Sequence, residues 1–257
     1  MEKHNFKKKF GQNFLRDNNI LDKIANSFDI QDGKIVEVGP GDGALTRRLI
    51  KKGKKVFAFE IDTSLKEYLD ELLCDNLNII YGDFLDVNLG DYFDKDEKLF
   101  VIANIPYYIT TPIITKFIDE KTIPEEMVLM VQKEVAERLS SGPRSKEYGA
   151  ISVILNYYFD IIYLFTVNRN CFYPIPNVDS AVIKLKKRDN LIYLNNFDNY
   201  KNLVYDAFKQ KRKTLKNNLK KYDLVKIESI LSKYNLGLNN RAEEISYEIF
   251  VEISNNI

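Results

Sequence analysis

Apolar and polar positions in the first half of the chain alternate between two repeating patterns. Short apolar runs predict buried strands at residues 34–38, 55–60, 77–81, 99–103 and 126–131. Between these runs, apolar side chains recur at helical spacing, which predicts helices over residues 41–52, 64–73, 112–120 and 133–139. Strands that alternate with helices indicate an α/β fold, in which helices cover both faces of a parallel sheet.

Residues 149–167 form an apolar stretch long enough to raise the question of a membrane span. Asn156 and Asp160 interrupt it, and a charged side chain in the middle of a span costs a few kcal/mol on insertion. The stretch therefore predicts a buried helix followed by a buried strand at 161–167. A final strand is expected at 181–185, and we expect no membrane association.

The pattern changes after residue 184. Residues 186–189 form a polar linker, and from Asn199 onward the apolar positions have helical spacing without a further strand. We place the domain boundary near residue 188. The expected organisation is one α/β domain over 1–188 and a small helical domain over 189–257.

Charge is unevenly distributed along a chain whose formal net charge is only +1. Residues 60–98 contain 12 acidic and 3 basic side chains, whereas residues 201–221 contain 8 basic and 1 acidic. Such a basic block often binds phosphates, although similar blocks also occur as solvated helix faces. The average charge says nothing about a polyanionic partner, but this local block makes a nucleic acid a reasonable candidate.

The rare residue types narrow the possible chemistry. The two cysteines, Cys74 and Cys171, lack the spacing of a zinc site or a disulfide framework. The single histidine, His4, removes catalysis by a histidine base or a histidine-rich metal site. The Lys-rich start has no apolar segment after it, which is unlike a signal peptide. These features favour a cytoplasmic protein.

Three glycines follow the first predicted strand, in the order Gly39, Gly41 and Gly43. Glycine permits a tight turn and a close approach of the backbone to a ligand, and the following helix would point its N-terminus at that ligand. With Ala44 the motif also fits the dinucleotide fingerprint. Glu60, at the end of the second strand, is placed to hold the ribose hydroxyls of either NAD or S-adenosylmethionine.

Two further features favour S-adenosylmethionine over NAD. Asp83 and Phe84 follow the third strand, where a carboxylate would accept from the adenine amino group and an aromatic ring would pack on its face. Asn104, Ile105, Pro106 and Tyr107 follow the fourth strand, a tetrapeptide that a dehydrogenase does not need.

The tetrapeptide suits methyl transfer to an amino group conjugated with an aromatic ring. The side-chain oxygen of Asn104 and the carbonyl of Ile105 would accept hydrogen bonds from that group and orient its lone pair. Pro106 would fix the backbone, and Tyr107 offers a face for stacking the target base. Catalysis would then consist mostly of positioning and electrostatic fit.

A base in RNA must leave its stack to reach such a pocket. A second wall is therefore needed opposite Tyr107. Phe172 is the candidate, since it lies in a proline-rich segment that predicts a loop. Ordinary core packing is the alternative interpretation for this residue.

Together these residues resemble the ribosomal RNA adenine dimethyltransferase family over nearly the whole chain. Residues 9–15 resemble the family's N-terminal segment, which closes over the methionine end of the cofactor. The resemblance implies a Rossmann-like S-adenosylmethionine-dependent methyltransferase sheet with a small helical C-terminal domain that binds rRNA. It implies cofactor contacts at Asn13, Leu15, Gly39, Glu60, Asp83 and Asn104. It implies catalytic roles for Asn104, Ile105, Pro106, Tyr107 and Phe172.

The family has two branches, and this chain resembles the one that dimethylates two adjacent adenosines near the 3′ end of small-subunit rRNA. The resemblance lies in residues 132–138, 146–150 and 178–182, where Asp179 stands in place of an asparagine that is usual in the other branch. That other branch modifies large-subunit rRNA and confers macrolide resistance. The basic residues 208–216 resemble the family's RNA-contacting helix, in which Lys and Arg bind phosphates without reading sequence.

Three alternatives stay open at this point. They are the large-subunit enzyme, a non-catalytic RNA-binding assembly factor, and a nicotinamide dehydrogenase. The intact tetrapeptide argues against the second, and the absence of a catalytic histidine argues against the third. We expect a monomer acting on small-subunit rRNA within a pre-ribosomal particle.

Overall fold

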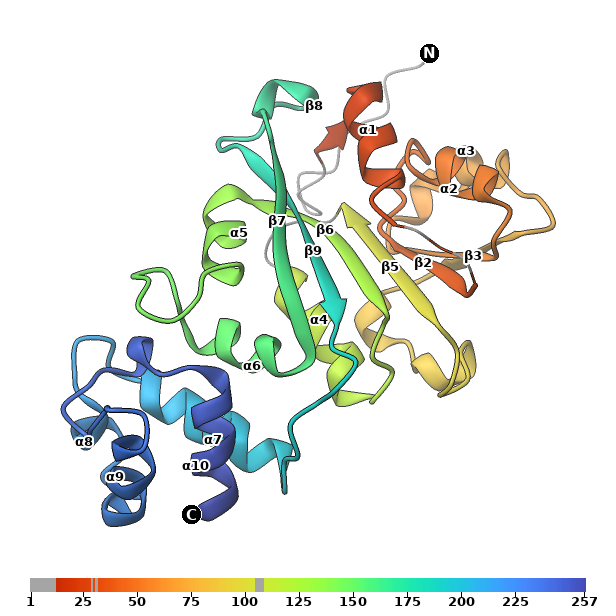
Figure 1. Cartoon of the computed structure of the whole chain (residues 1–257). Helices are drawn as coiled ribbons and strands as arrows, with labels where there is room; N and C mark the ends of the chain where they lie inside the picture. The colour runs from red at the N-terminus through yellow and green to blue at the C-terminus, as the bar shows by residue number, and fades with distance from the viewer. Residues whose placement is uncertain (1–12, 29, 31, 105–108) are drawn as a thin grey trace. The chain divides into compact units, whose positions relative to one another are not determined.

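A computed structural model of the chain describes residues 13–28, 30, 32–104 and 109–257 (Figure 1). By its contacts the chain divides into two compact units. Unit 1 comprises Met1–Ala136 and Ile162–Lys187, and unit 2 comprises Glu137–Ile161 and Arg188–Ile257. The chain therefore crosses between the units at 187–188, close to the expected boundary, but residues 137–161 group with the second unit instead of the first. The division into functional domains remains a prediction.

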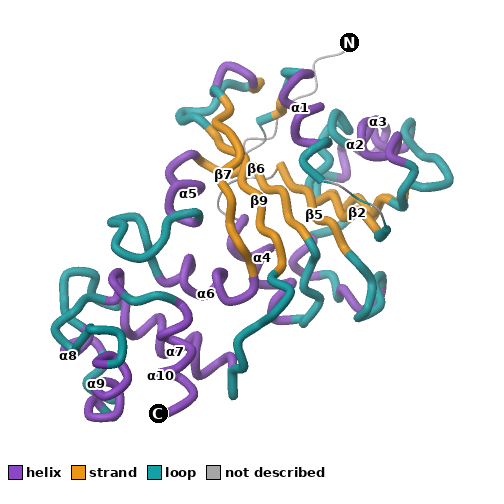
Figure 2. Tube along the Cα trace, viewed as in Figure 1, coloured by secondary structure: helices purple, strands orange, loops and turns teal. Residues whose placement is uncertain are grey.

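A seven-stranded sheet forms the frame, with strand order β4-β3-β2-β5-β6-β9-β7 (Figure 2). The strands are β2 (Lys34–Val38), β3 (Val56–Glu60), β4 (Leu77–Tyr81), β5 (Leu99–Asn104), β6 (Glu126–Gln132), β7 (Phe159–Val167) and β9 (Ser180–Lys187). From β4 to β6 all neighbours pair in parallel, and β9 pairs antiparallel with β6. The predicted α/β, Rossmann-like sheet is confirmed.

β5 and β6 are apolar between their end residues because both faces of a parallel sheet are covered. Five consecutive residues of β5 and five of β6 are buried. β7 differs, because it is an edge strand: Val167 is fully buried, whereas Ile162 is 46% exposed. The apolar stretch at 149–167 does form a helix followed by a strand, but the prediction that this strand is buried is wrong.

The helices of the first half are α1 (Asn18–Ala25), α2 (Thr46–Leu49), α3 (Lys66–Asp70), α4 (Thr110–Asp119) and α5 (Lys133–Leu139). The helix expected over 41–52 begins only at Thr46, because Gly39, Gly41 and Gly43 adopt left-handed φ values of 73°, 61° and 78°. Short 3-10 turns flank α2 and α3 at Ile50–Lys52 and Thr63–Leu65. The sequence pattern did not predict α1, which Asp17 caps by accepting from the N–H groups of Asn19 and Ile20.

A second, two-stranded sheet was also not predicted. β1 (Phe14–Leu15) pairs antiparallel with β8 (Phe172–Tyr173), and Leu15 stands opposite Phe172 although the two residues are 157 positions apart. This pairing brings the N-terminal segment to the segment that precedes β9.

Unit 2 is helical, as the pattern after residue 199 predicts. It contains α6 (Ala150–Tyr158), α7 (Phe197–Phe208), α8 (Leu215–Asn218), α9 (Leu224–Ser232) and α10 (Tyr247–Asn256). Its core includes fully buried Tyr200, whose hydroxyl donates to the carbonyl of Val153 at 2.9 Å. Across the described ranges, no helix is both long and apolar enough to traverse a bilayer.

Candidate active site

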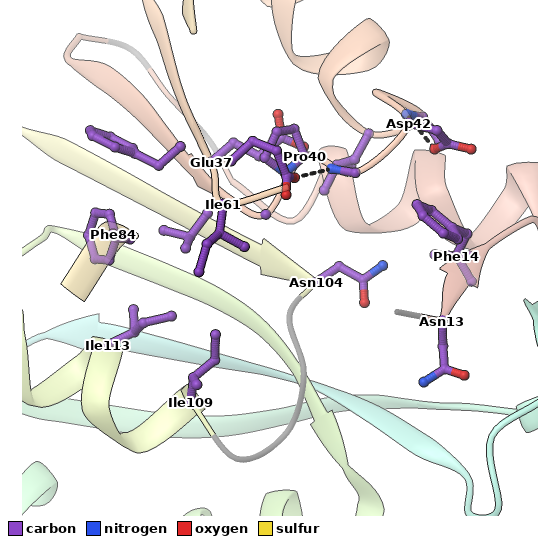
Figure 3. A pocket seen from close by; sticks show the side chains of 18 of the residues that line it. Asn13, Phe14, Glu37, Pro40, Asp42, Ile61, Phe84, Asn104, Ile109 and Ile113 are labelled. Carbon is purple, nitrogen blue, oxygen red and sulfur yellow. Dashed lines mark hydrogen bonds between the residues drawn. The ribbon is translucent and has the colours of Figure 1, made fainter. Parts of the chain in front are cut away.

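A cavity of about 300 Å3 opens at the carboxyl ends of β2, β3, β4 and β5 (Figure 3). Its walls come from residues 13–15, 37–42, 44–45, 59–61 and 82–85, joined by Leu21, Asn104, Ile109, Ile113 and Phe172. Ligands of open parallel sheets bind at this end of the strands. All of these residues belong to unit 1.

The glycine turn after β2 forms one wall of this cavity. A Cβ atom on Gly41 would lie 3.0 Å from Cε1 of Phe14, and one on Gly43 would lie 2.4 Å from Cδ1 of Leu72. The turn therefore needs glycine at both positions, for the backbone conformation and for space. The lining reaches Leu45, the N-cap residue of α2, so this short helix begins at the edge of the cavity.

Glu60 closes β3 with its carboxylate held by two backbone amides. The N–H of Gly41 donates to Oε2 at 3.0 Å, and the N–H of Asp62 donates to Oε1 at 2.8 Å. The side chain is buried, and burial raises its pKa, while the amides of Asp62 and Gly41 oppose that rise. Glu60 thus presents a fixed acceptor at the base of the glycine turn.

Glu37 also lines the cavity, which the sequence pattern did not predict. It is buried in β2, and its Oε2 has no hydrogen-bond partner among the residues that the structure describes. Burial, opposed by the Thr46 hydroxyl and reinforced by the nearby Glu60 carboxylate, raises the pKa of Glu37 to about 8. The only signal in the sequence was a carboxylic residue two positions before Gly39.

The raised pKa of Glu37 predicts a pH-dependent stability. Between its ordinary value of 4.5 and about 8, the folded chain binds a proton that the unfolded chain has lost, so the free energy of unfolding falls as pH rises through this window. Glu37→Gln cannot bind this proton, so the variant should lack the pH-dependent fall in the free energy of unfolding, which is on the order of several kcal/mol across this window. Urea unfolding at pH 5, 6, 7 and 8 should show a shallower pH slope for the variant. Parallel slopes would refute the assignment.

Asp83 follows β4 and lines the cavity beside an apolar wall. Its Oδ1 accepts from the N–H of Leu85 at 2.9 Å, which caps a short 3-10 turn. Phe84 lines the cavity too, but it is buried and packs edge-on against Phe59 at a centroid distance of 5.1 Å. The more accessible apolar surface belongs to Ile61, which is 45% exposed.

Asn104 is the last residue of β5, and its half-buried side chain points into the cavity (Figure 3). Parallel pairing on both sides of β5 determines its position. On the β2 side, the preceding residue Ala103 stands opposite Val38. On the β6 side, Asn104 itself stands opposite Met130. The remaining residues of the predicted tetrapeptide, Ile105, Pro106 and Tyr107, lie outside the described residues.

The N-terminal segment and Phe172 meet at the cavity through the β1–β8 pair. Asn13, Leu15 and Phe172 all line it. The loop predicted around Phe172 is a two-residue strand, and the side chain is only 4% exposed because Leu15 and the apolar cluster of unit 1 cover it. Phe172 therefore belongs to the core and to the cavity wall at once.

Seven of the ten predicted site residues are described, and the structure brings all seven to one cavity. They are Asn13, Leu15, Gly39, Glu60, Asp83, Asn104 and Phe172. Their individual roles stay predictions. The sequence did not predict a place in the cavity for Glu37 or for the apolar wall of Ile61, Ile109 and Ile113. In a sequence, an isoleucine that contacts a ligand looks the same as an isoleucine of the hydrophobic core.

Comparison with known proteins gives one consistent result. Residues 3–257 match the family described as ribosomal RNA adenine dimethylase. A ribosomal RNA small subunit methyltransferase A from Aster yellows witches'-broom phytoplasma is 43% identical over 260 residues, covering 98% of this chain and 96% of the relative.

Two solved structures are similar over almost the whole chain. A dimethyladenosine transferase from Plasmodium falciparum has a TM-score of 0.76 and 27% identity, covering 93% of this chain and 95% of the other. The 23S rRNA methyltransferase ErmE has a TM-score of 0.73 and 27% identity, covering 95% and 99%.

Proposed function

Because the chain belongs to the ribosomal RNA adenine dimethylase family, we propose that it dimethylates two adjacent adenosines near the 3′ end of small-subunit rRNA. The methyl donor is S-adenosylmethionine. The observation that carries the proposal is the position of Asn104, which opens into the same cavity as the glycine turn and Glu60. One cavity thus has an acceptor for an amino group beside a candidate cofactor site.

The residues of the cavity fit S-adenosylmethionine. Gly41 lines the cavity without a side chain, and the buried Oε2 of Glu37 lacks a partner in the described part of the chain. A ligand that carries positive charge would lower the raised pKa of Glu37 and pair with its ionised carboxylate. Glu60 would accept from the ribose hydroxyls and Asp83 from the adenine amino group, with Ile61 against the ring. When bound, the cofactor supplies an electrophilic methyl group on a sulfonium sulfur.

Asn104 activates the target by positioning it. An adenine amino nitrogen is a poor nucleophile because its lone pair is delocalised into the ring. The side-chain oxygen of Asn104 accepts one N–H of that group and turns its lone pair toward the methyl donor. The nitrogen is strongly acidic after transfer, so water can take the proton, and the main contributions are orientation and electrostatic fit. The carbonyl of Ile105, the ring of Pro106 and the ring of Tyr107 are proposed to complete this arrangement.

The target base must leave its stack to enter the cavity. Phe172, buried and held by the β1–β8 pair, is proposed to form one stacking wall. N-terminal residues Asn13 and Leu15 are proposed to cover the methionine end of the cofactor, since they line the same cavity.

The small-subunit substrate is favoured over the large-subunit one by sequence similarity. The fold does not separate the two, because the solved structures of a dimethyladenosine transferase and of a 23S rRNA methyltransferase match with similar TM-scores. The relative named as a small-subunit methyltransferase is 43% identical over nearly the full length. We further propose that the enzyme acts as a monomer, in the cytoplasm, on a pre-ribosomal particle.

Methyl transfer from labelled S-adenosylmethionine tests the proposed function. The acceptors are small ribosomal subunits lacking the modification and unmodified large-subunit rRNA, with mass spectrometry to count methyl groups on adenosine. We expect dimethyladenosine only in the small subunit. Label confined to large-subunit rRNA would contradict the substrate, and bound cofactor without any label would favour a non-catalytic assembly factor.

Exposed basic residues of unit 2 are proposed to bind rRNA phosphates. Lys209, Lys211, Arg212 and Lys213 follow α7 and are all exposed. The Nζ of Lys211 donates to the carbonyl of Lys146 at 2.6 Å, so this segment is held against the 140–149 loop of the same unit. These exposed basic residues support the proposal that the helical domain over 189–257 binds rRNA.

Charge reversal at Arg212 and Lys213 should weaken rRNA binding and flatten its salt dependence. Each lost phosphate contact reduces the slope of log affinity against log salt by about 1. Filter binding of small-subunit rRNA between 50 and 200 mM salt, roughly the range over which phosphate contacts are felt, measures both effects. Charge reversal at Lys226, an exposed lysine of α9 outside the basic segment, is the control for the change in net charge. An unchanged slope in the Arg212 and Lys213 variant would contradict the assignment.

A further inference from the structure

Successive side chains of β8 face opposite environments. Phe172 is 4% exposed and lines the cavity, whereas Tyr173 is 57% exposed. Neighbouring residues of a strand point to opposite sides of it, so the β1–β8 pair that buries Phe172 also presents the ring of Tyr173 to solvent. An accessible aromatic ring therefore stands one residue from the wall proposed to hold the target base.

Tyr173 begins an apolar rim segment, defined here as residues 173–178. Ile175 is 59% exposed and Val178 is 44% exposed, and Pro174 and Pro176 lie between them. Exposed large apolar side chains are unremarkable singly, but three within six residues, directly after a residue that lines the cavity, indicate an interaction surface.

Backbone hydrogen bonds within unit 1 hold the residues that flank the rim segment on both sides. On one side the N–H of Arg16 donates to the carbonyl of Cys171 at 2.8 Å. On the other side the carbonyl of Asp179 accepts from the N–H of Lys133 at 3.1 Å, and the carboxylate of Asp179 accepts from the N–H of Arg169 at 2.9 Å. The segment is thus a preformed surface beside the cavity.

The charge around this surface suits a polyanion. Arg169 is exposed, and its guanidinium donates to the carbonyl of Asn177 in the rim segment at 3.3 Å. Lys133 is also exposed, and its backbone N–H donates to the carbonyl of Asp179. Basic side chains bind phosphates, while an exposed aromatic ring stacks on a base. An apolar surface with basic residues beside it is a better match for single-stranded RNA than for the apolar surface of a partner protein.

We propose that Tyr173 is the stacking platform for the nucleotide next to the target adenine. Extrusion of the target base removes a stacking partner from its neighbour, and the ring of Tyr173 replaces that partner on the solvent-facing side of β8. Phe172 and Tyr173, which are consecutive residues of β8, then each stack on one of two consecutive bases of the RNA. This inference rests on the proposed function, because it needs RNA with an adenine in the cavity.

The test measures binding of a fluorescent single-stranded RNA oligonucleotide with one central adenine, in the presence of S-adenosylhomocysteine. In two further oligonucleotides an abasic site replaces the base on the 5′ or the 3′ side. We expect one of the two abasic sites to lower wild-type affinity by about tenfold, a typical effect of losing one base–aromatic stack. Tyr173→Ala should lose about tenfold with the intact oligonucleotide and nothing further with the abasic one.

Control variants separate stacking from a structural role. Tyr173→Phe keeps the ring and should restore the response to the abasic site. Tyr193→Ala removes a tyrosine that is 78% exposed in unit 2 and should leave that response intact. An abasic effect equal in wild type and Tyr173→Ala would overturn the inference, as would no abasic effect in the wild type. Methyl transfer by the wild type to small subunits tests the proposed function separately, so its failure is distinguished from failure of the platform.

Discussion

Replacement of Asn104 by alanine should lower kcat by about a hundredfold to a thousandfold, the range seen when one pre-aligned hydrogen-bonding group is removed from an active site. The Asn104 side chain stands at the end of β5, fixed by pairing on both sides of the strand. Its loss removes the acceptor that orients the amino group, without a change in the sheet. Turnover should therefore fall far more than cofactor affinity.

Single-turnover methyl transfer to small ribosomal subunits, with calorimetric titration of S-adenosylmethionine, measures the two effects separately. Asn78→Ala is the matched control, because Asn78 is an exposed asparagine of β4 that does not line the cavity. Full turnover by Asn104→Ala would remove Asn104 from the mechanism. Equal losses of turnover and of cofactor affinity would make it a cofactor contact only.

Glu60→Ala should weaken S-adenosylmethionine binding by about 10- to 100-fold, since hydrogen bonds to a charged group contribute about 1.5–3 kcal/mol each. Two causes add. The ribose hydroxyls lose their proposed acceptor, and the N–H groups of Gly41 and Asp62 lose the carboxylate that orders the turn. The second cause would also lower the melting temperature of the protein without ligand.

Two further variants divide these causes. Glu60→Gln keeps an acceptor oxygen and should retain more stability than alanine while still binding the cofactor less tightly. Glu67→Ala, in α3 and exposed, controls for the loss of a carboxylate outside the cavity. Calorimetry and thermal unfolding measure the outcome, and an unchanged dissociation constant for Glu60→Ala would refute the ribose assignment.

Hydrophobic periodicity predicted the frame of the fold. The strand Leu77–Tyr81 and the helix Lys133–Leu139 begin and end where the pattern places them, because burial on one or both faces determines which positions must be apolar. The order of strands and helices also predicted where the site lies. Gly39, Glu60, Asp83 and Asn104 each follow or end a parallel strand, and parallel strands end at one edge of the sheet.

Local patterns failed where backbone conformation or long-range pairing decides the structure. The helix expected at 41–52 starts at Thr46, because three left-handed glycines build a turn that periodicity does not detect. Strands of two residues, such as Phe14–Leu15 and Phe172–Tyr173, are too short to show a period at all. Grouping of residues 137–161 with the second unit likewise depends on contacts distant in sequence.

By itself, then, the sequence determined the α/β frame, the family and the strand ends that carry the site, because these follow from short-range pattern and from motif. Only the tertiary structure decided that Leu15 and Phe172 form one wall and that Tyr173 faces outward beside it. Only the tertiary structure decided that Glu37 is buried at the cavity with a raised pKa. Burial and pairing depend on residues that are far apart in the chain, and they exist only when the whole chain has folded.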